Sequence, residues 1–186
     1  SGYYRDQTFM LALNEISVQQ IFSALYANTD LKKEPMSGGR QMGSHFMSNY
    51  IDEKGDFIDS TQKYNSSADI SPTSGQMPRL LGLAMASKLY RDGSFNSKNF
   101  SNNGNEVAWG TIGNASTSEG PFFEVFNAAG VHQVPMIISV WDDEYGISVD
   151  NSYQTTKSSI SKALHGFKRD KLNKGFEIYT VDGWDY

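Results

Sequence analysis

The segment from Glu106 to Trp141 limits most strongly what this chain can fold into. An apolar run at 106–112 (EVAWGTI) is followed by small residues at 113–120, a helical stretch at 121–130 (PFFEVFNAAG) and a second apolar run at 133–141 (QVPMIISVW). Strands that are apolar throughout are typical of a buried parallel sheet, and a helix between them makes the pair parallel. The segment therefore predicts a βαβ unit and an α/β fold.

Hydrophobic periodicity predicts further elements on both sides of this unit. They are helices over 6–28 (with Ser17 able to start a second helix), 76–90 and 155–167, a strand over 175–181, a long ordered loop over 28–65 and a polar connection over 92–105. A loop of that length in a compact domain is usually functional or an interaction surface. We expect one domain over 1–186, an α/β three-layer sandwich with a mostly parallel sheet.

Composition narrows the class of protein. The formal charge of −5 and the scattered basic residues argue against a nucleic-acid partner, and the lack of cysteine excludes a disulfide framework. No apolar run approaches the ~20 residues of a membrane span. We expect a soluble, cytoplasmic protein with no membrane partner. Because the chain lacks an initiator Met and has aromatic residues near both ends, we also expect a segment of a longer chain, truncated at its C-terminal end.

Two loops follow the carboxyl ends of the predicted parallel strands, where open α/β sheets bind ligands. Residues 113–120 (GNASTSEG) offer backbone N–H groups and a helix N-terminus to phosphate, and Asp142 and Asp143 offer oxygen ligands to Mg²⁺ or Ca²⁺. Each loop alone has a plainer interpretation, a tight βα turn or a pair of turn-capping aspartates. Together they indicate a phosphate and metal site.

The spacing of the two loops resembles a known cofactor motif. Asp143 follows Asn114 by 29 positions, and the thiamine-diphosphate motif has Gly-Asp-Gly followed nearly thirty residues later by Asn-Asn. The stretches GNASTSEGPFFEVFNAAG and VWDDEYGISV resemble the decarboxylating component, α subunit, of the 2-oxo acid dehydrogenases, especially the branched-chain (2-oxoisovalerate) type. The resemblance implies the diphosphate-binding half of the thiamine-diphosphate-binding fold, with thiamine diphosphate and Mg²⁺ as cofactors.

Three further blocks, in the same order as in the family, extend the resemblance over nearly the whole chain: Tyr4-Arg5, Gly39-Arg40-Gln41-Met42 with His45, and 71–78 (SPTSGQMP). The resemblance implies that Tyr4 and Arg5 bind the diphosphate and that the backbone at Ser71 and Thr73 contacts the aminopyrimidine. His45 is the candidate catalytic residue. The alternatives are a surface ion pair with Asp6 for Arg5 and a structural role for His45.

The resemblance also assigns the residues around the diphosphate and the metal. The cofactor-binding set adds Gly113, Asn114, Ala115, Ser116 and Asp143, and the metal ligands are Asn114, Asp143 and the Tyr145 carbonyl. The sequence departs from the family here, because Asn114 and Asp143 exchange the usual Asp and Asn, and Ala115 replaces a glycine. An amide oxygen is a weaker ligand than a carboxylate, so we expect weakened or conditional Mg²⁺ binding.

The implied function is oxidative decarboxylation of a branched-chain 2-oxo acid with acyl transfer to a lipoyl group. The implied partners are a pyrimidine-side domain or β subunit, which supplies the glutamate that the cofactor needs, and a lipoyl acyltransferase. Since no residue here matches that glutamate, the isolated chain is expected to be inactive. The alternatives are a related thiamine enzyme, such as an acetoin dehydrogenase or transketolase, and a non-catalytic scaffold of the same fold.

Overall fold

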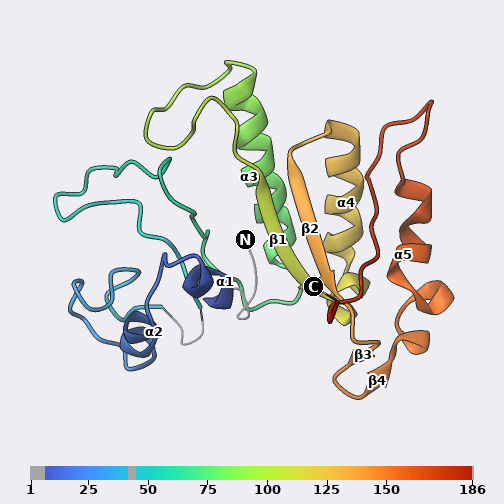
Figure 1. Cartoon of the computed structure of the whole chain (residues 1–186), viewed down its shortest axis with the longest axis horizontal. Coiled ribbons are helices and arrows are strands. Elements are labelled where there is room, and N and C mark those ends of the chain that lie inside the picture. The colour runs from blue at the N-terminus through green and yellow to red at the C-terminus, as the bar shows by residue number, and fades with distance from the viewer. Residues whose placement is uncertain (1–6, 42–44, 186) are drawn as a thin grey trace.

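The computed structural model describes residues 7–41 and 45–185 and shows a mixed α/β fold (Figure 1). Its helices and strands are α1 (Gln7–Ala12), α2 (Val18–Leu25), α3 (Gln76–Arg91), β1 (Ala108–Gly113), α4 (Gly120–His132), β2 (Met136–Trp141), β3 (Tyr145–Gly146), β4 (Val149–Asp150) and α5 (Ile160–Ala163), with short 3-10 turns between some of them. Within the described residues, no helix is long and apolar enough to cross a membrane.

The predicted βαβ unit is confirmed. Strands β1 and β2 pair in parallel from Ala108 opposite Met136 to Gly113 opposite Trp141, and α4 connects them. In Figure 1, α3 lies alongside β1 and α4 alongside β2. The main core lies between the sheet and these helices and consists of Met77, Leu80, Ile112, Phe122, Val125, Phe126, Ile160 and Leu164.

The opposite face of the sheet carries the side chains that alternate with the core residues. Trp109 and Trp141 lie there, and Phe9 of α1 packs against both, with ring centroids 4.8 Å and 5.7 Å away. Trp109 and Ile137 remain exposed. The described residues thus form a parallel sheet of two strands, with α3 and α4 on one face and an α1 side chain on the other.

The N-terminal helical stretch forms two helices, as Ser17 predicts. The Ser17 hydroxyl accepts the Gln20 N–H, and the Gln20 side chain accepts the Ser17 N–H, so the two residues form a capping box. Met10 and Ile16 pack with Met36 and Phe46 in a second, smaller core. The helices are therefore attached to the long loop that follows them.

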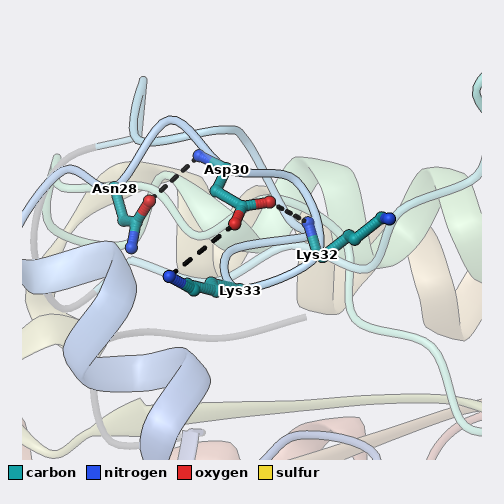
Figure 2. Close-up of polar contacts among 4 residues, drawn as sticks. All are labelled: Asn28, Asp30, Lys32 and Lys33. Carbon is teal, nitrogen blue, oxygen red and sulfur yellow. Dashed lines mark hydrogen bonds and ion pairs between the residues drawn. The ribbon is translucent and has the colours of Figure 1, made fainter.

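The predicted long loop is also confirmed, because the described residues between α2 and α3 contain no helix and only one isolated strand bridge, Ile51 with Phe57. Side chains hold its turns. Figure 2 shows the first turn, where Asn28 accepts the Asp30 N–H, Asp30 accepts the Lys32 N–H, and Lys33 lies 3.9 Å from the Asp30 carboxylate. The loop is therefore ordered by local polar contacts.

Of two predictions near the C-terminal end, the helix is confirmed only from Ile160 onward, in α5 and the 3-10 turn that follows it, and the strand is wrong. The helix expected over 155–167 is broken, because Lys157 and Ser158 have left-handed φ values of 61° and 48° and Ser159 is extended. The strand expected over 175–181 has no neighbouring strand, and only Phe176 forms a bridge, with Lys168. Phe176 instead stacks on Phe126 of α4 at 4.1 Å. The apolar pattern at 175–181 therefore reflects packing against a helix.

Candidate functional site

The carboxyl ends of β1 and β2 bring the two candidate loops together. Gly113 and Trp141 are opposite each other in the sheet, and the next backbone N–H, that of Asn114, donates to the Trp141 carbonyl at 3.0 Å. The polar loops therefore leave the same edge of the sheet, as expected for parallel strands.

Asn114 lies at the centre of this edge and is 3% exposed. Its side-chain amide donates to Asn151 Oδ1 at 3.4 Å, and the Asn151 amide donates to Asp142 Oδ1 at 3.3 Å. A chain of hydrogen bonds thus joins the loop after β1 to the loop after β2. Sequence reasoning missed Asn151, which the β3–β4 hairpin returns to the site by pairing the Asn151 N–H with the Glu144 carbonyl at 2.9 Å.

The other predicted metal ligands are Asp143, in the exposed turn after β2, and Tyr145, the exposed first residue of β3. The Asp143 carboxylate accepts the Tyr145 N–H at 3.2 Å, and the neighbouring Asp142 accepts the Glu144 N–H at 3.0 Å. Among the described residues, the hydrogen bonds link Asn114 to Asp142 and leave Asp143 in its own turn. Both aspartates therefore help to shape the turn, and the bond from Tyr145 uses Asp143 Oδ1 and leaves Oδ2 for a cation.

The donor set at this edge fits a hard cation through amide, carboxylate and carbonyl oxygens. In the described part of the chain, no three His, Cys, Asp or Glu side chains converge on one point. The Asn114 amide N–H₂ is directed to Asn151, while its Oδ1 accepts no hydrogen bond from the described residues. Asn151 thus orients the side chain of the buried residue Asn114, as outer residues around metal sites commonly do.

The loop after β1 has the form expected of a phosphate-binding turn. Ala115 to Ser118 form one 3-10 turn, so Ala115 keeps a negative φ, and the chain then enters the thirteen-residue helix α4. Thr117 is buried, and its hydroxyl donates to the Asn114 carbonyl at 2.6 Å. The Ser116 hydroxyl makes no hydrogen bond with the described residues, so it is available to an anion at the positive end of α4.

Gly146 explains how closely the two loops approach each other. A Cβ at this position would lie 2.6 Å from Ala115 Cβ and 2.7 Å from the Gln154 side-chain amide. The β3–β4 hairpin therefore packs directly on the residue that replaces the family's glycine. The loop after β1 thus has two contacts with the segment that follows β2. Ala115 lies against Gly146, and the Ser118 hydroxyl donates to the Gln154 carbonyl at 3.1 Å.

The turn at 71–75, expected to contact the aminopyrimidine, is attached to the same edge of the sheet. Gln76, the first residue of α3, is buried, and its Nε2 donates to the Thr111 carbonyl of β1 at 3.0 Å. Ser71 and Thr73 are exposed, and the turn is closed by the Gly75 N–H donating to the Pro72 carbonyl at 2.9 Å. Gln76 thus attaches this turn to β1 at Thr111, which lies two residues before Gly113 in the strand.

His45 is brought to this turn from the long loop. Its Nε2 lies 2.8 Å from the Ser71 hydroxyl, although the two residues are 26 positions apart. The structure therefore brings together the candidate catalytic residue and the candidate aminopyrimidine turn. Tyr4 and Arg5, the predicted diphosphate ligands near the start of the chain, lie outside the described residues.

A buried carboxylate organises the loop before His45. Glu34 is 0% exposed, and its two oxygens accept the N–H groups of Met36 at 2.9 Å, Ser37 at 3.0 Å and Gly39 at 2.6 Å. The Ser37 hydroxyl also donates to Glu34, at 2.8 Å. Such a ring of backbone N–H groups stabilises an anion without a basic partner. Glu34 therefore sets the turn from which Arg40 and Gln41 extend.

Comparison with known proteins agrees with the resemblance seen in the sequence. The family model for the dehydrogenase E1 component matches residues 1–183. The chain is 29% identical over 183 residues to the 2-oxoisovalerate dehydrogenase subunit alpha of Bacillus subtilis (strain 168). These 183 residues are 98% of this chain and 44% of that subunit. The chain therefore spans less than half the length of this relative. Because the family model covers nearly the whole sequence, the protein belongs to the dehydrogenase E1 component family.

Proposed function

We propose that this chain forms the diphosphate-binding side of a thiamine-diphosphate-dependent 2-oxo acid dehydrogenase. The observation that carries the proposal is the hydrogen-bonded chain from Asn114 through Asn151 to Asp142, which joins the two strand-end loops at one edge of the parallel sheet. Membership of the dehydrogenase E1 component family, which depends on thiamine diphosphate, supports it. In the whole protein, further strands and helices would complete a three-layer sandwich.

The residues around this edge would hold the cofactor. Asn114 Oδ1, the Asp143 carboxylate and the Tyr145 carbonyl would hold Mg²⁺, and the diphosphate would lie against the turn at 113–116 (Gly113, Asn114, Ala115 and Ser116). Tyr4 and Arg5 would add donors, of which the guanidinium of Arg5 suits a phosphate. Ser71 and Thr73 would contact the aminopyrimidine through their backbone. Thiamine diphosphate, when bound, supplies the electron sink that decarboxylation of a 2-oxo acid requires.

The proposed substrate is a branched-chain 2-oxo acid, and the acyl group would pass to a lipoyl group on an acyltransferase. The name of the Bacillus relative supports this substrate class and a partner β subunit. His45, held beside Ser71, would bind the substrate carboxylate or exchange a proton with a reacting oxygen. The remaining catalytic groups would come from the β subunit or a pyrimidine-side domain, in a cytoplasmic assembly.

Titration of the full-length protein with thiamine diphosphate, with and without Mg²⁺, tests the ligand assignment. We expect Mg²⁺ to strengthen binding, and to strengthen it more in Asn114→Asp, because a carboxylate is the stronger ligand. Equal affinity for both proteins in both conditions would remove Asn114 from the metal site. It would also favour the non-catalytic scaffold, the alternative suggested by Asn114 itself.

Release of CO₂ from 3-methyl-2-oxobutanoate by the full-length assembly tests the reaction. We expect turnover that requires thiamine diphosphate and acylates a lipoyl acceptor. A panel of 2-oxo acids and acetoin then separates the branched-chain enzyme from a related thiamine enzyme. We expect no turnover from residues 1–186 alone, and measurable turnover by this segment would refute the division of the site between two parts.

A further inference from the structure

The contact between His45 and Ser71 depends on a pairing of two loop segments. The Asp69 N–H donates to the Phe46 carbonyl at 3.1 Å, and the Asp69 carboxylate accepts the Phe46 N–H at 2.9 Å. Two residues further, the Ser48 N–H donates to the Ser66 carbonyl at 2.9 Å. The described residues of this region form no regular strand, so individual hydrogen bonds such as these hold the segments side by side.

Asp69 differs from the other aspartates of the long loop. Asp52 and Asp59 are exposed, and their carboxylates accept N–H groups two to four residues away within their own turns. Asp69 is 9% exposed and reaches across 23 positions to Phe46. Burying a carboxylate is costly unless it is hydrogen-bonded, so a buried aspartate is a strong constraint on the segment that it binds.

We propose that Asp69 is a positioning residue that holds His45 against Ser71. His45 immediately precedes Phe46, whose N–H Asp69 binds, and Ser71 lies two residues after Asp69. Asp69 is thus joined by hydrogen bonds to the residue after His45 and, through two residues of backbone, to Ser71. Its removal leaves the backbone bond from Asp69 to the Phe46 carbonyl, but the Phe46 N–H loses its acceptor and the His45 ring gains freedom. The inference rests on the proposed function only for its effect on catalysis.

The structural part of the proposal is tested without activity. The 186 residues contain three histidines, His45, His132 and His165. In imidazole ¹⁵N spectra of the full-length protein labelled at histidine, single His→Gln variants identify the signals of these three. We expect Asp69→Ala to shift and broaden the His45 signals, as Ser71→Ala should also do, and to leave the signals of His132 and His165 unchanged. Asp69→Asn should have a smaller effect, because an amide oxygen still accepts the Phe46 N–H.

Asp59→Ala is the matched control, since Asp59 belongs to the same loop and its carboxylate, among the described residues, binds Thr61 alone. It should leave all three histidines unchanged. His45 signals that are the same in Asp69→Ala as in the wild type would overturn the proposal. Signals that move equally for all three histidines would also overturn it, because they would indicate a general loss of folding.

The catalytic part is tested by a double-mutant cycle in the assembled enzyme. We expect Asp69→Ala and His45→Ala each to lower kcat/KM, the former on the order of 10- to 100-fold, as for a misplaced group. If Asp69 acts through His45, the double variant should be no slower than His45→Ala within about 2-fold. A double variant whose loss in kcat/KM equals the product of the losses of the two single variants would overturn the proposal. A wild-type assembly with no 2-oxo acid turnover would contradict the proposed function instead, and the spectra would still decide whether Asp69 holds His45.

Discussion

Asn114 and Asn151 share a hydrogen bond across 37 positions of sequence, with the Asn114 amide donating to Asn151 Oδ1 at 3.4 Å. The bond directs one end of the Asn114 side chain toward the β3–β4 hairpin and leaves Oδ1 for another ligand. The orientation of the proposed metal ligand thus depends on a residue that does not belong to the family motif.

Asn151→Ala should therefore weaken Mg²⁺-dependent binding of thiamine diphosphate roughly 10- to 100-fold, the usual effect of losing a residue that orients a metal ligand. Calorimetric titration of the full-length protein measures it. Asn173→Ala is the control, because within the described part of the chain the exposed Asn173 amide binds Asp170 alone. An Asn151→Ala protein with unchanged Mg²⁺ dependence would contradict the role of Asn151.

Gly146→Ala should push the two strand-end loops apart, because the new Cβ would lie 2.6 Å from Ala115 Cβ. We expect a loss of about 1–3 kcal/mol in the free energy of unfolding, measured in urea, together with weaker cofactor binding. Adding Ala115→Gly should restore part of both, since it removes the facing methyl group but leaves the Gln154 amide in place. Gly82→Ala, in the interior of α3 with open space around it, should instead stabilise the protein by about 0.5–1 kcal/mol.

Glu34→Gln should destabilise the loop before His45. The N–H groups of Met36, Ser37 and Gly39 all point at the two carboxylate oxygens, and an amide NH₂ in place of one oxygen would face them as a second donor. We expect a loss of about 2–4 kcal/mol in the free energy of unfolding. Glu53→Gln, an exposed glutamate of the same loop, should change it by less than about 0.5 kcal/mol. Equal effects from the two substitutions would contradict the role assigned to Glu34.

Glu106 should make stability depend on pH. Burial raises the pKa of Glu106, but hydrogen bonds from the Asn102 N–H and the Ser101 hydroxyl and the charge of Arg91 outweigh burial, so the pKa lies below its usual value. A lowered pKa in the folded state stabilises the protein above the unfolded-state value of about 4.3, and the stabilisation is lost as the pH falls through the folded-state value. The stability difference between wild type and Glu106→Gln should thus shrink below about pH 4. Glu124→Gln, which replaces an exposed glutamate of α4, is the control substitution.

The sequence predicted the elements that depend on local signals. The capping residues Ser17 and Gln20 marked the start of α2, and the continuous apolar runs around α4 marked the two parallel strands. The same runs located the two loops at the sheet edge, because a parallel pair places its strand ends together. The link between these loops depends on Asn151, which only the folded hairpin brings within reach.

The predictions that failed concern segments whose structure depends on contacts distant in sequence or on competing side-chain hydrogen bonds. A helix was expected over 155–167, but serine side chains compete with helical hydrogen bonds, and Lys157 and Ser158 turn left-handed there. A strand was expected over 175–181, yet a strand requires a neighbour, and Phe176 finds the ring of Phe126 instead. Periodicity records which side chains are buried, and it does not record what buries them.

The long loop that carries His45 has consequences for how the site can change over generations. Its shape depends on a few carboxylates, Glu34 and Asp69 among them, each of which fixes one short stretch of backbone. A single substitution can therefore re-form one turn while the parallel strands, held by a continuous ladder, stay where they are. The part of the proposed site at the strand ends should therefore tolerate few changes in shape, whereas the part on the loop can change one turn at a time.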